Sequence, residues 1–186
     1  MKDMMKPALI LSGIYIIAAL LLSALDGVTS PIIETMNEKA NNEARQLVLS
    51  EATEFTLIEG LTGENVAEVW EGKNGEDVVG YTIKTLPKGY GGEMEVIVGI
   101  SVDGIITGVD IGSHSETPGL GSKAKDESFK GQYLQKSVEN PLQVVKGSAN
   151  GESDIVAISG ATITSNAVTL GVNSAIEIFN QNLANK

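Results

Sequence analysis

A run of hydroxyl-bearing and small side chains is the part of this sequence whose residue types best suit chemistry. The run comprises Ile158, Ser159, Gly160, Ala161, Thr162, Ile163, Thr164 and Ser165. Apolar residues recur at helical spacing after it, so it marks the start of a helix. Because the first N–H groups of a helix lack partners and the helix dipole is positive there, such a turn suits a phosphate group. A helix start capped by Thr164 or Ser165, with nothing bound, explains the same residues and is the more common arrangement.

Two glycine-rich loops are the other segments with unusual residue types. One comprises His114, Ser115, Glu116, Thr117, Pro118, Gly119, Leu120 and Gly121, and the other comprises Gly89, Tyr90, Gly91 and Gly92. Taken alone, each indicates turn chemistry, because glycine tolerates positive φ and proline fixes φ. His114 is the only histidine, and a structural hydrogen bond explains a loop histidine more readily than a chemical role does. Tyr90 and Trp70 could stack on a bound ring, although single aromatic residues in strands usually belong to the core.

The composition of the chain limits the chemistry that its side chains can perform. The 186 residues include no cysteine, which excludes thiolate iron–sulfur clusters, Cys-based zinc sites, disulfides and thiol catalysis. We predict no catalytic residue and no metal site, so a redox role requires a bound cofactor. The formal net charge of -11 argues against a nucleic-acid partner, because phosphate backbones bind basic surfaces.

Residues 7–25 carry no charge and are long enough to form a transmembrane helix. At 1.5 Å per residue, about 19 residues nearly span the hydrocarbon core of a bilayer. A cleaved signal peptide is the alternative, but its apolar region is usually shorter, at about 7 to 15 residues. Lys2 and Lys6 precede the segment, whereas Asp26 and Glu34 follow it. By the positive-inside rule we expect a cytoplasmic N-terminus and a domain outside the cytoplasm.

The rest of the chain is predicted to form two further regions. Residues 27–52 form a juxtamembrane amphipathic helix, because apolar residues recur at helical spacing from 31 to 51. Its apolar stripe either packs on the following domain or lies on the bilayer surface. Residues 53–186 form the domain that carries the three segments described above. The predicted organisation is therefore 1–26 for the N-terminus and transmembrane helix, 27–52 for the amphipathic helix, and 53–186 for the domain.

Within the domain, short β-rich runs are followed by helices. The runs cover residues 55–58, 66–70, 78–84, 94–102 and 105–111. Asn74-Gly75 and Asp103-Gly104 separate pairs of them and favour two antiparallel hairpins. A helix near 126–137, a strand near 143–146 and a final helix beyond Thr164 complete the prediction. Gly171 interrupts that helix at a cost of about 1 kcal/mol relative to alanine, which indicates close packing there. The predicted fold class is α+β.

Ser159 to Ser165 resemble the flavinylation motif of the FMN-binding domain shared by two kinds of membrane protein. These are the G subunit of Rnf-type electron-transport complexes and the C subunit of sodium-pumping NADH:quinone reductases. The loops 114–121 and 89–92 resemble two further motifs of this family, in the family's order. In this chain Val156 stands where the family usually has an aspartate, and Asp154 is the nearest acidic residue.

The resemblance implies a site and a cofactor for the chain. FMN would be esterified through its phosphate to Thr162 by a separate flavin transferase that consumes FAD. A threonine hydroxyl is a poor nucleophile without a base, so the transferase must activate it. The implied cofactor-binding residues are Thr162, Ser159, Gly160, Ala161, Thr164, Ser165, Glu116, Thr117, Gly119, Leu120 and Lys123. Glu116 and Thr117 would border the flavin, with a tight turn as the alternative, and an exposed lysine is the simpler account of Lys123.

The function implied by the resemblance is electron transfer within a membrane-bound, ion-translocating ferredoxin:NAD oxidoreductase. The chain would be a subunit of this translocase with no turnover alone. Its partners would be other membrane subunits, at least one with a flavin or an iron–sulfur cluster, in a bacterial or archaeal cell membrane. The alternatives are a C-type subunit of the quinone reductase, a stand-alone extracytoplasmic flavoprotein reductase and a non-redox binding domain. Neighbouring genes and the colour of the purified protein would distinguish them.

Overall fold

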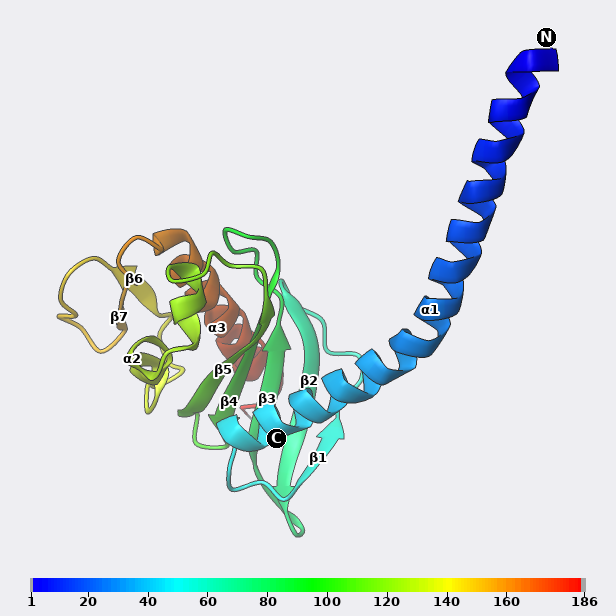
Figure 1. Cartoon of the computed structure of the whole chain (residues 1–186). Helices are drawn as coiled ribbons and strands as arrows, with labels where there is room; N and C mark the ends of the chain where they lie inside the picture. Colours follow the sequence, from blue (N-terminus) through cyan, green and yellow to red (C-terminus); the bar gives the residue numbers. More distant parts are fainter. Residues whose placement is uncertain (1, 185–186) are drawn as a thin grey trace. The chain divides into compact units, whose positions relative to one another are not determined.

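The computed structural model describes residues 2–184 and divides the chain into two compact units, residues 1–41 and 42–186. Helix α1 (Lys2–Val48) makes up the first unit, and its last residues, from 42 on, belong to the second (Figure 1). Residues Ile10–Gly27 have a mean hydropathy of 2.0 and could cross a membrane by length and composition. The transmembrane and amphipathic helices that we expected as separate elements are one continuous helix in this structure.

A five-stranded antiparallel sheet dominates the second unit. Its strands lie in the order of the sequence: β1 (Glu54–Leu57), β2 (Val66–Asn74), β3 (Asp77–Thr85), β4 (Met94–Ser101) and β5 (Ile106–His114). Gly75 and Gly104 have φ angles of 67° and 72° in the turns that join β2 to β3 and β4 to β5. Positive φ in short hairpin loops is the reason why these dipeptides form turns. Both predicted hairpins, and the α+β class, are confirmed.

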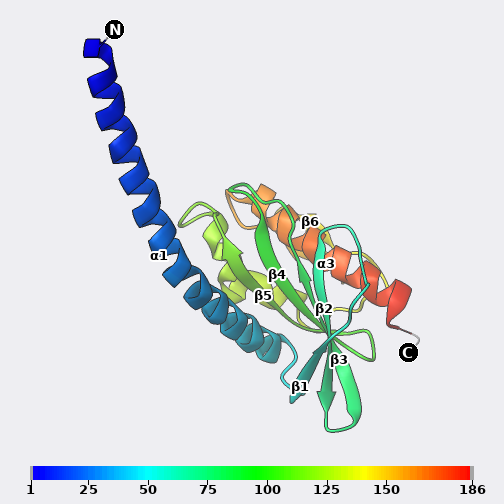
Figure 2. The ribbon, with the colours of Figure 1, turned by 90° about the vertical axis from the view of Figure 1, so that its right-hand side faces the viewer.

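Helix α3 (Thr162–Asn182) lies along one face of the sheet (Figure 2) and encloses the core. Alternate residues of β4 point toward it, and Val96, Val98 and Ile100 have no exposed surface. The ring of Tyr81 meets Phe179 edge to face, with 6.0 Å between ring centroids. A Cβ on Gly171 would lie 2.6 Å from Thr85 Oγ1. This close approach of α3 to the sheet explains the glycine in the middle of the helix.

The last turn of α1 packs against glycines of β4 and β5. Gly99 and Gly108 face each other across the two strands, and a Cβ on Gly99 would lie 2.2 Å from the carbonyl oxygen of Val48. The hydroxyl of Thr107 donates a hydrogen bond to that oxygen. The absence of side chains at these two positions therefore lets the helix end reach the sheet backbone.

A buried arginine near the end of α1 also attaches this helix to the sheet. Arg45 is 6% exposed, its guanidinium lies 3.7 Å from the centre of the Trp70 ring, and its Nη2 lies 3.0 Å from Glu68 Oε2. Burial lowers the pKa of Arg45, and the contact with Glu68 opposes that shift. Cation–π contact and ion pairing thus hold the end of α1 to β2.

The segment after β5 differs from the prediction. The helix expected near 126–137 is a series of short turns: η1 (Gly121–Lys125), α2 (Glu127–Lys130) and η2 (Gly131–Tyr133). Gln135 adopts φ of 63°, which ends helical geometry, and its N–H donates to Ile106 O at the start of β5. The predicted strand near 143–146 is β6 (Gln143–Val145), and it pairs in parallel with the short, unpredicted strand β7 (Asp154–Val156).

Candidate functional site

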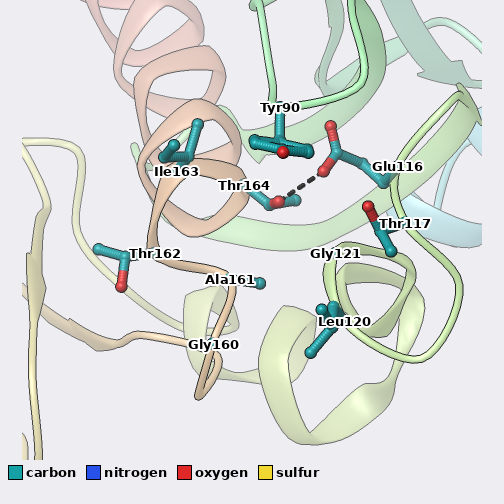
Figure 3. A pocket seen from close by; sticks show the side chains of 10 residues that line it. All are labelled: Tyr90, Glu116, Thr117, Leu120, Gly121, Gly160, Ala161, Thr162, Ile163 and Thr164. Carbon is teal, nitrogen blue, oxygen red and sulfur yellow. Dashed lines mark hydrogen bonds between the residues drawn. The ribbon is translucent and has the colours of Figure 1, made fainter.

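A cavity of about 530 Å³ lies where three distant segments of the chain meet (Figure 3). The loop after β3, the loop after β5 and the start of α3 contribute its walls. This volume is within the range of pockets that hold small molecules and cofactors, about 300 to 1,000 Å³. The lining residues are Tyr90, Glu116, Thr117, Leu120, Gly121, Gly160, Ala161, Thr162, Ile163 and Thr164. The three sequence segments that we singled out therefore form one site.

The start of α3 offers free N–H donors to this cavity. The helix begins at Thr162, two residues after Gly160, whose φ is 79°, and no side chain caps it. The first helical hydrogen bond runs from Ser165 N–H to Ala161 O, at 3.0 Å. Across the described residues, the N–H groups of 162, 163 and 164 have no acceptor. This turn therefore has the donors and the positive dipole end that bind a phosphate group.

The prediction that Thr164 or Ser165 caps the helix is wrong. Because the helix begins at Thr162, both residues lie inside its first turn. The Ser165 hydroxyl accepts a hydrogen bond from Ile158 N–H at 2.9 Å and donates to Ala161 O at 3.0 Å. Ser165 thus holds the turn between β7 and α3 in place and does not occupy the helix N–H groups.

The two threonines of the turn have different surroundings. Thr164 is 1% exposed, and its hydroxyl donates a hydrogen bond of 2.6 Å to Glu116 Oε2. Thr162 is half-buried, and its hydroxyl has no hydrogen bond to any described residue. Figure 3 shows the Thr162 side chain projecting away from the pair formed by Glu116 and Thr164. Of the two hydroxyls, only that of Thr162 is open to a reagent from outside.

Glu116 joins all three walls of the cavity. Its side chain is 6% exposed, and its Oε1 accepts a hydrogen bond of 3.0 Å from Gly91 N–H. A Cβ on Gly89 or on Gly121 would lie 2.3 Å from one of the carboxylate oxygens. The glycines of both loops are therefore needed for close approach to this carboxylate, and not only for turn formation.

Apolar side chains surround the mouth of the cavity. Tyr90 is 70% exposed, Ile163 57% and Leu120 44%. An exposed aromatic ring beside aliphatic side chains suits a flat apolar ligand. The N–H donors of α3 lie at another part of the cavity wall. The lining residues together therefore fit a molecule that combines a planar ring with a phosphate.

Some of the site residues expected from the sequence do not line the cavity. These are Ser159, Ser165, Gly119 and Lys123. Gly119 has φ of 76° and shapes the loop, while Lys123 lies on η1. Gly121 and Ile163 line the cavity although we did not predict them as ligands, and so does Tyr90, one of the two aromatic residues considered for stacking. Trp70, the other candidate for stacking, lies beneath Arg45 instead.

His114 has a structural role in the loop after β5. Its Nδ1 accepts a hydrogen bond of 3.2 Å from Glu116 N–H. Burial and, secondarily, the charge of Lys125 lower the pKa of His114, which favours the neutral imidazole that this contact requires. Among the described residues no group of three His, Cys, Asp or Glu side chains could hold a metal ion.

The strand that leads to Thr162 is held by side-chain contacts. The Gln132 side chain accepts from Val156 N–H at 2.7 Å and donates to Val156 O at 3.2 Å. Asp154 accepts hydrogen bonds from Asn150 N–H, Gln143 Nε2 and Gly151 N–H, and these contacts lower its pKa. The carboxylate of Asp154 is thus occupied within its own loop, so it does not substitute for an acid at position 156.

Known proteins resemble this chain over most of its length. Residues 89–177 match the family model described as FMN-binding domain. The chain is 44% identical to the G subunit of the Na(+)-translocating ferredoxin:NAD(+) oxidoreductase complex of Acetobacterium woodii, covering 98% of this chain and 94% of that protein. It is 35% identical to the G subunit of the proton-translocating ferredoxin:NAD(+) oxidoreductase complex of Clostridium ljungdahlii, covering 87% and 83%.

A solved structure shares the fold. It is the C subunit of the Na(+)-translocating NADH-quinone reductase of Parabacteroides distasonis, with a TM-score of 0.64 and 20% identity over 83% of this chain and 96% of that one. At this identity the likeness concerns the fold alone. The family match over residues 89–177 includes all three segments that line the cavity.

Proposed function

Since this chain belongs to the family of G subunits of ion-translocating ferredoxin:NAD oxidoreductase complexes, we propose that it passes electrons through an FMN esterified to Thr162. The chain is an electron-transfer subunit of an oxidoreductase. The observation that carries the proposed site is the open Thr162 hydroxyl at the edge of a cofactor-sized cavity, next to unpaired helix N–H groups. FMN supplies the redox chemistry when bound.

Different residues of the cavity would contact different parts of this cofactor. The N–H groups at the start of α3 would bind the phosphate oxygens, and the positive end of the helix would stabilise their charge. Gly160 and Ala161 carry little side-chain bulk, so the phosphate can approach Thr162 closely. Tyr90, Leu120 and Ile163 would contact the ring at the mouth of the cavity. Thr117, also in the lining, would offer a hydroxyl to its polar edge.

Attachment to Thr162 requires another enzyme. No titratable base is in hydrogen-bond contact with the Thr162 hydroxyl among the described residues, and an unassisted hydroxyl is a weak nucleophile. We propose that a flavin transferase supplies the base. In this transfer the threonine oxygen forms a bond to the FMN phosphorus of FAD, the phosphoanhydride bond breaks, AMP leaves and the hydroxyl proton passes to the base.

The partners are other subunits of the same complex. The relatives are subunits of ferredoxin:NAD oxidoreductase complexes, and the apolar segment of α1 and these relatives indicate association with a membrane. We propose that neighbouring membrane subunits with a flavin or an iron–sulfur cluster exchange electrons with this chain.

Optical spectroscopy of the membrane-embedded complex tests the electron-transfer role. On addition of reduced ferredoxin, the flavin on this chain should bleach before NADH accumulates and recover when NAD is supplied. The isolated chain should show no ferredoxin:NAD activity, because it lacks the other carriers. A flavin that stays oxidised during steady NAD reduction would exclude this chain from the electron path.

We further propose that the domain lies outside the cytoplasm, on the basis of Lys2 and Lys6 before the apolar segment. Protease added to spheroplasts should then digest the domain and spare an N-terminal fragment. A tag at the N-terminus and one at the C-terminus, detected in parallel, identify which end is lost. Digestion of the domain only after the membrane is opened would reverse the orientation.

A further inference from the structure

We propose that the carboxylate of Glu116 lowers the reduction potential of the flavin, by placing an uncompensated negative charge in the wall of the flavin pocket. The inference rests on the proposed function, since it requires a flavin in the cavity. It assigns to Glu116 a tuning role separate from attachment, which depends on Thr162.

The hydrogen bonds of Glu116 are those of a carboxylate. Gly91 N–H donates to Oε1 and the Thr164 hydroxyl donates to Oε2, so each oxygen accepts a hydrogen bond from a different segment. An ionised carboxylate accepts at both oxygens, so both contacts suit the charged form of this side chain. These contacts and the 6% exposure fix the position of the charge relative to the cavity.

No positive side chain neutralises this carboxylate within the described part of the chain. Other part-buried glutamates of the domain pair with cations: Glu95 lies 2.9 Å from Lys84, and Glu68 lies 3.0 Å from Arg45. Glu116 has no such ion pair there, and its two side-chain partners are neutral donors. The neighbouring His114 accepts a hydrogen bond at Nδ1, as a neutral ring does. A negative charge without a counter-ion therefore remains at the cavity wall.

The charge lies at the part of the cavity that suits the flavin ring. Figure 3 shows Glu116 beside Tyr90, whose ring belongs to the apolar mouth. Glu116 is 6% exposed, and around a buried charge Coulomb interactions are stronger than in bulk solvent. Added electrons raise the negative charge of the flavin, so a fixed carboxylate disfavours the reduced form. Removal of the charge should raise the potential.

The test is Glu116→Gln in the full-length protein carrying its flavin. Glutamine has the same shape, its oxygen can still accept from Gly91 N–H, and the Thr164 hydroxyl can rotate to accept from its amide. We expect complete covalent loading and a midpoint potential raised by at least about 30 mV, which is a tenfold change in the ratio of reduced to oxidised flavin for a two-electron couple. Redox titration followed by flavin absorbance measures the shift.

Thr164→Val is the matched control, because it removes the hydroxyl contact and keeps the charge. Its potential should not rise. A fully loaded Glu116→Gln protein with an unchanged or lowered potential would overturn the proposal. Loss of covalent flavin from that variant would also overturn it, because Glu116 would then serve attachment. If the wild-type protein itself carries no flavin, the proposed function fails and not this inference alone.

Discussion

Thr162→Ala is expected to abolish covalent flavin and, with it, ferredoxin-dependent NAD reduction by the complex. Of the two threonine hydroxyls in the turn, only that of Thr162 is open and next to free helix N–H groups, so Thr164 cannot replace it. The fold should be unaffected, because Thr162 is half-buried and its side chain forms no hydrogen bond to a described residue. Flavin fluorescence of the denatured protein measures loading, and membrane vesicles measure NAD reduction.

Thr164→Ala is the matched variant two residues along the same turn. Its hydroxyl is buried against Glu116, so its loss should leave covalent loading intact while removing one hydrogen bond to a charged group, at a cost of about 1.5 to 3 kcal/mol in folding stability. Equal loading of both variants, or loss of flavin from Thr164→Ala alone, would contradict the assignment of the acceptor.

Gly99→Ala is expected to destabilise the domain by about 1 to 3 kcal/mol, as overpacking does elsewhere. The new Cβ would lie 2.2 Å from Val48 O and 2.7 Å from Val48 C, and these backbone atoms cannot move without displacing the end of α1. Thermal unfolding of the full-length protein in detergent should show the loss. Trp70, the only tryptophan, lies beneath Arg45 of the same helix end, so its fluorescence should report the displacement.

Gly131→Ala is the control with the opposite expected sign. Gly131 has φ of -63° and ψ of -17°, and the nearest atom to its new Cβ would be Glu127 Oε2 at 3.8 Å. Alanine fits there without strain and reduces the entropy of the unfolded chain, which stabilises by about 0.4 to 1 kcal/mol. If the Gly99→Ala protein unfolded at the same temperature as the Gly131→Ala protein, or at a higher one, α1 would not pack tightly on the sheet.

The hairpins and the turn that leads into α3 could be predicted from the sequence, because each depends on local rules. Asn74-Gly75 and Asp103-Gly104 supply the positive φ that a hairpin turn requires, whatever the rest of the chain does. The prediction of a helix near 126–137 was wrong because long-range contacts determine the conformation of that segment. The backbone groups of Gln135 and Lys136 form hydrogen bonds with the backbone of Ile106. Strand β7 was missed because its three residues become a strand by pairing with β6, a contact that no local pattern indicates.

The assembly of the site could be predicted only in part. Motif order identified the loop of Glu116 and the turn of Thr162, but not the hydrogen bond between Glu116 and Thr164, which joins residues 48 positions apart. Likewise, nothing in the sequence distinguished Tyr90 from Trp70 as a pocket residue. In the folded chain the Trp70 ring packs against Arg45, whereas Tyr90 remains exposed at the cavity. Side-chain partners across distant segments are a property of the folded chain.

Tandem mass spectrometry of the native protein tests the central claim most directly. Trypsin should release residues 147–186 as one peptide, because no Lys or Arg lies between Lys146 and Lys186. The peptide should carry the mass of FMN less one water. Fragments that end at Ala161 should be unmodified, and those that end at Thr162 should carry the full addition. A peptide of unmodified mass, or an addition that first appears at Thr164, would contradict the account.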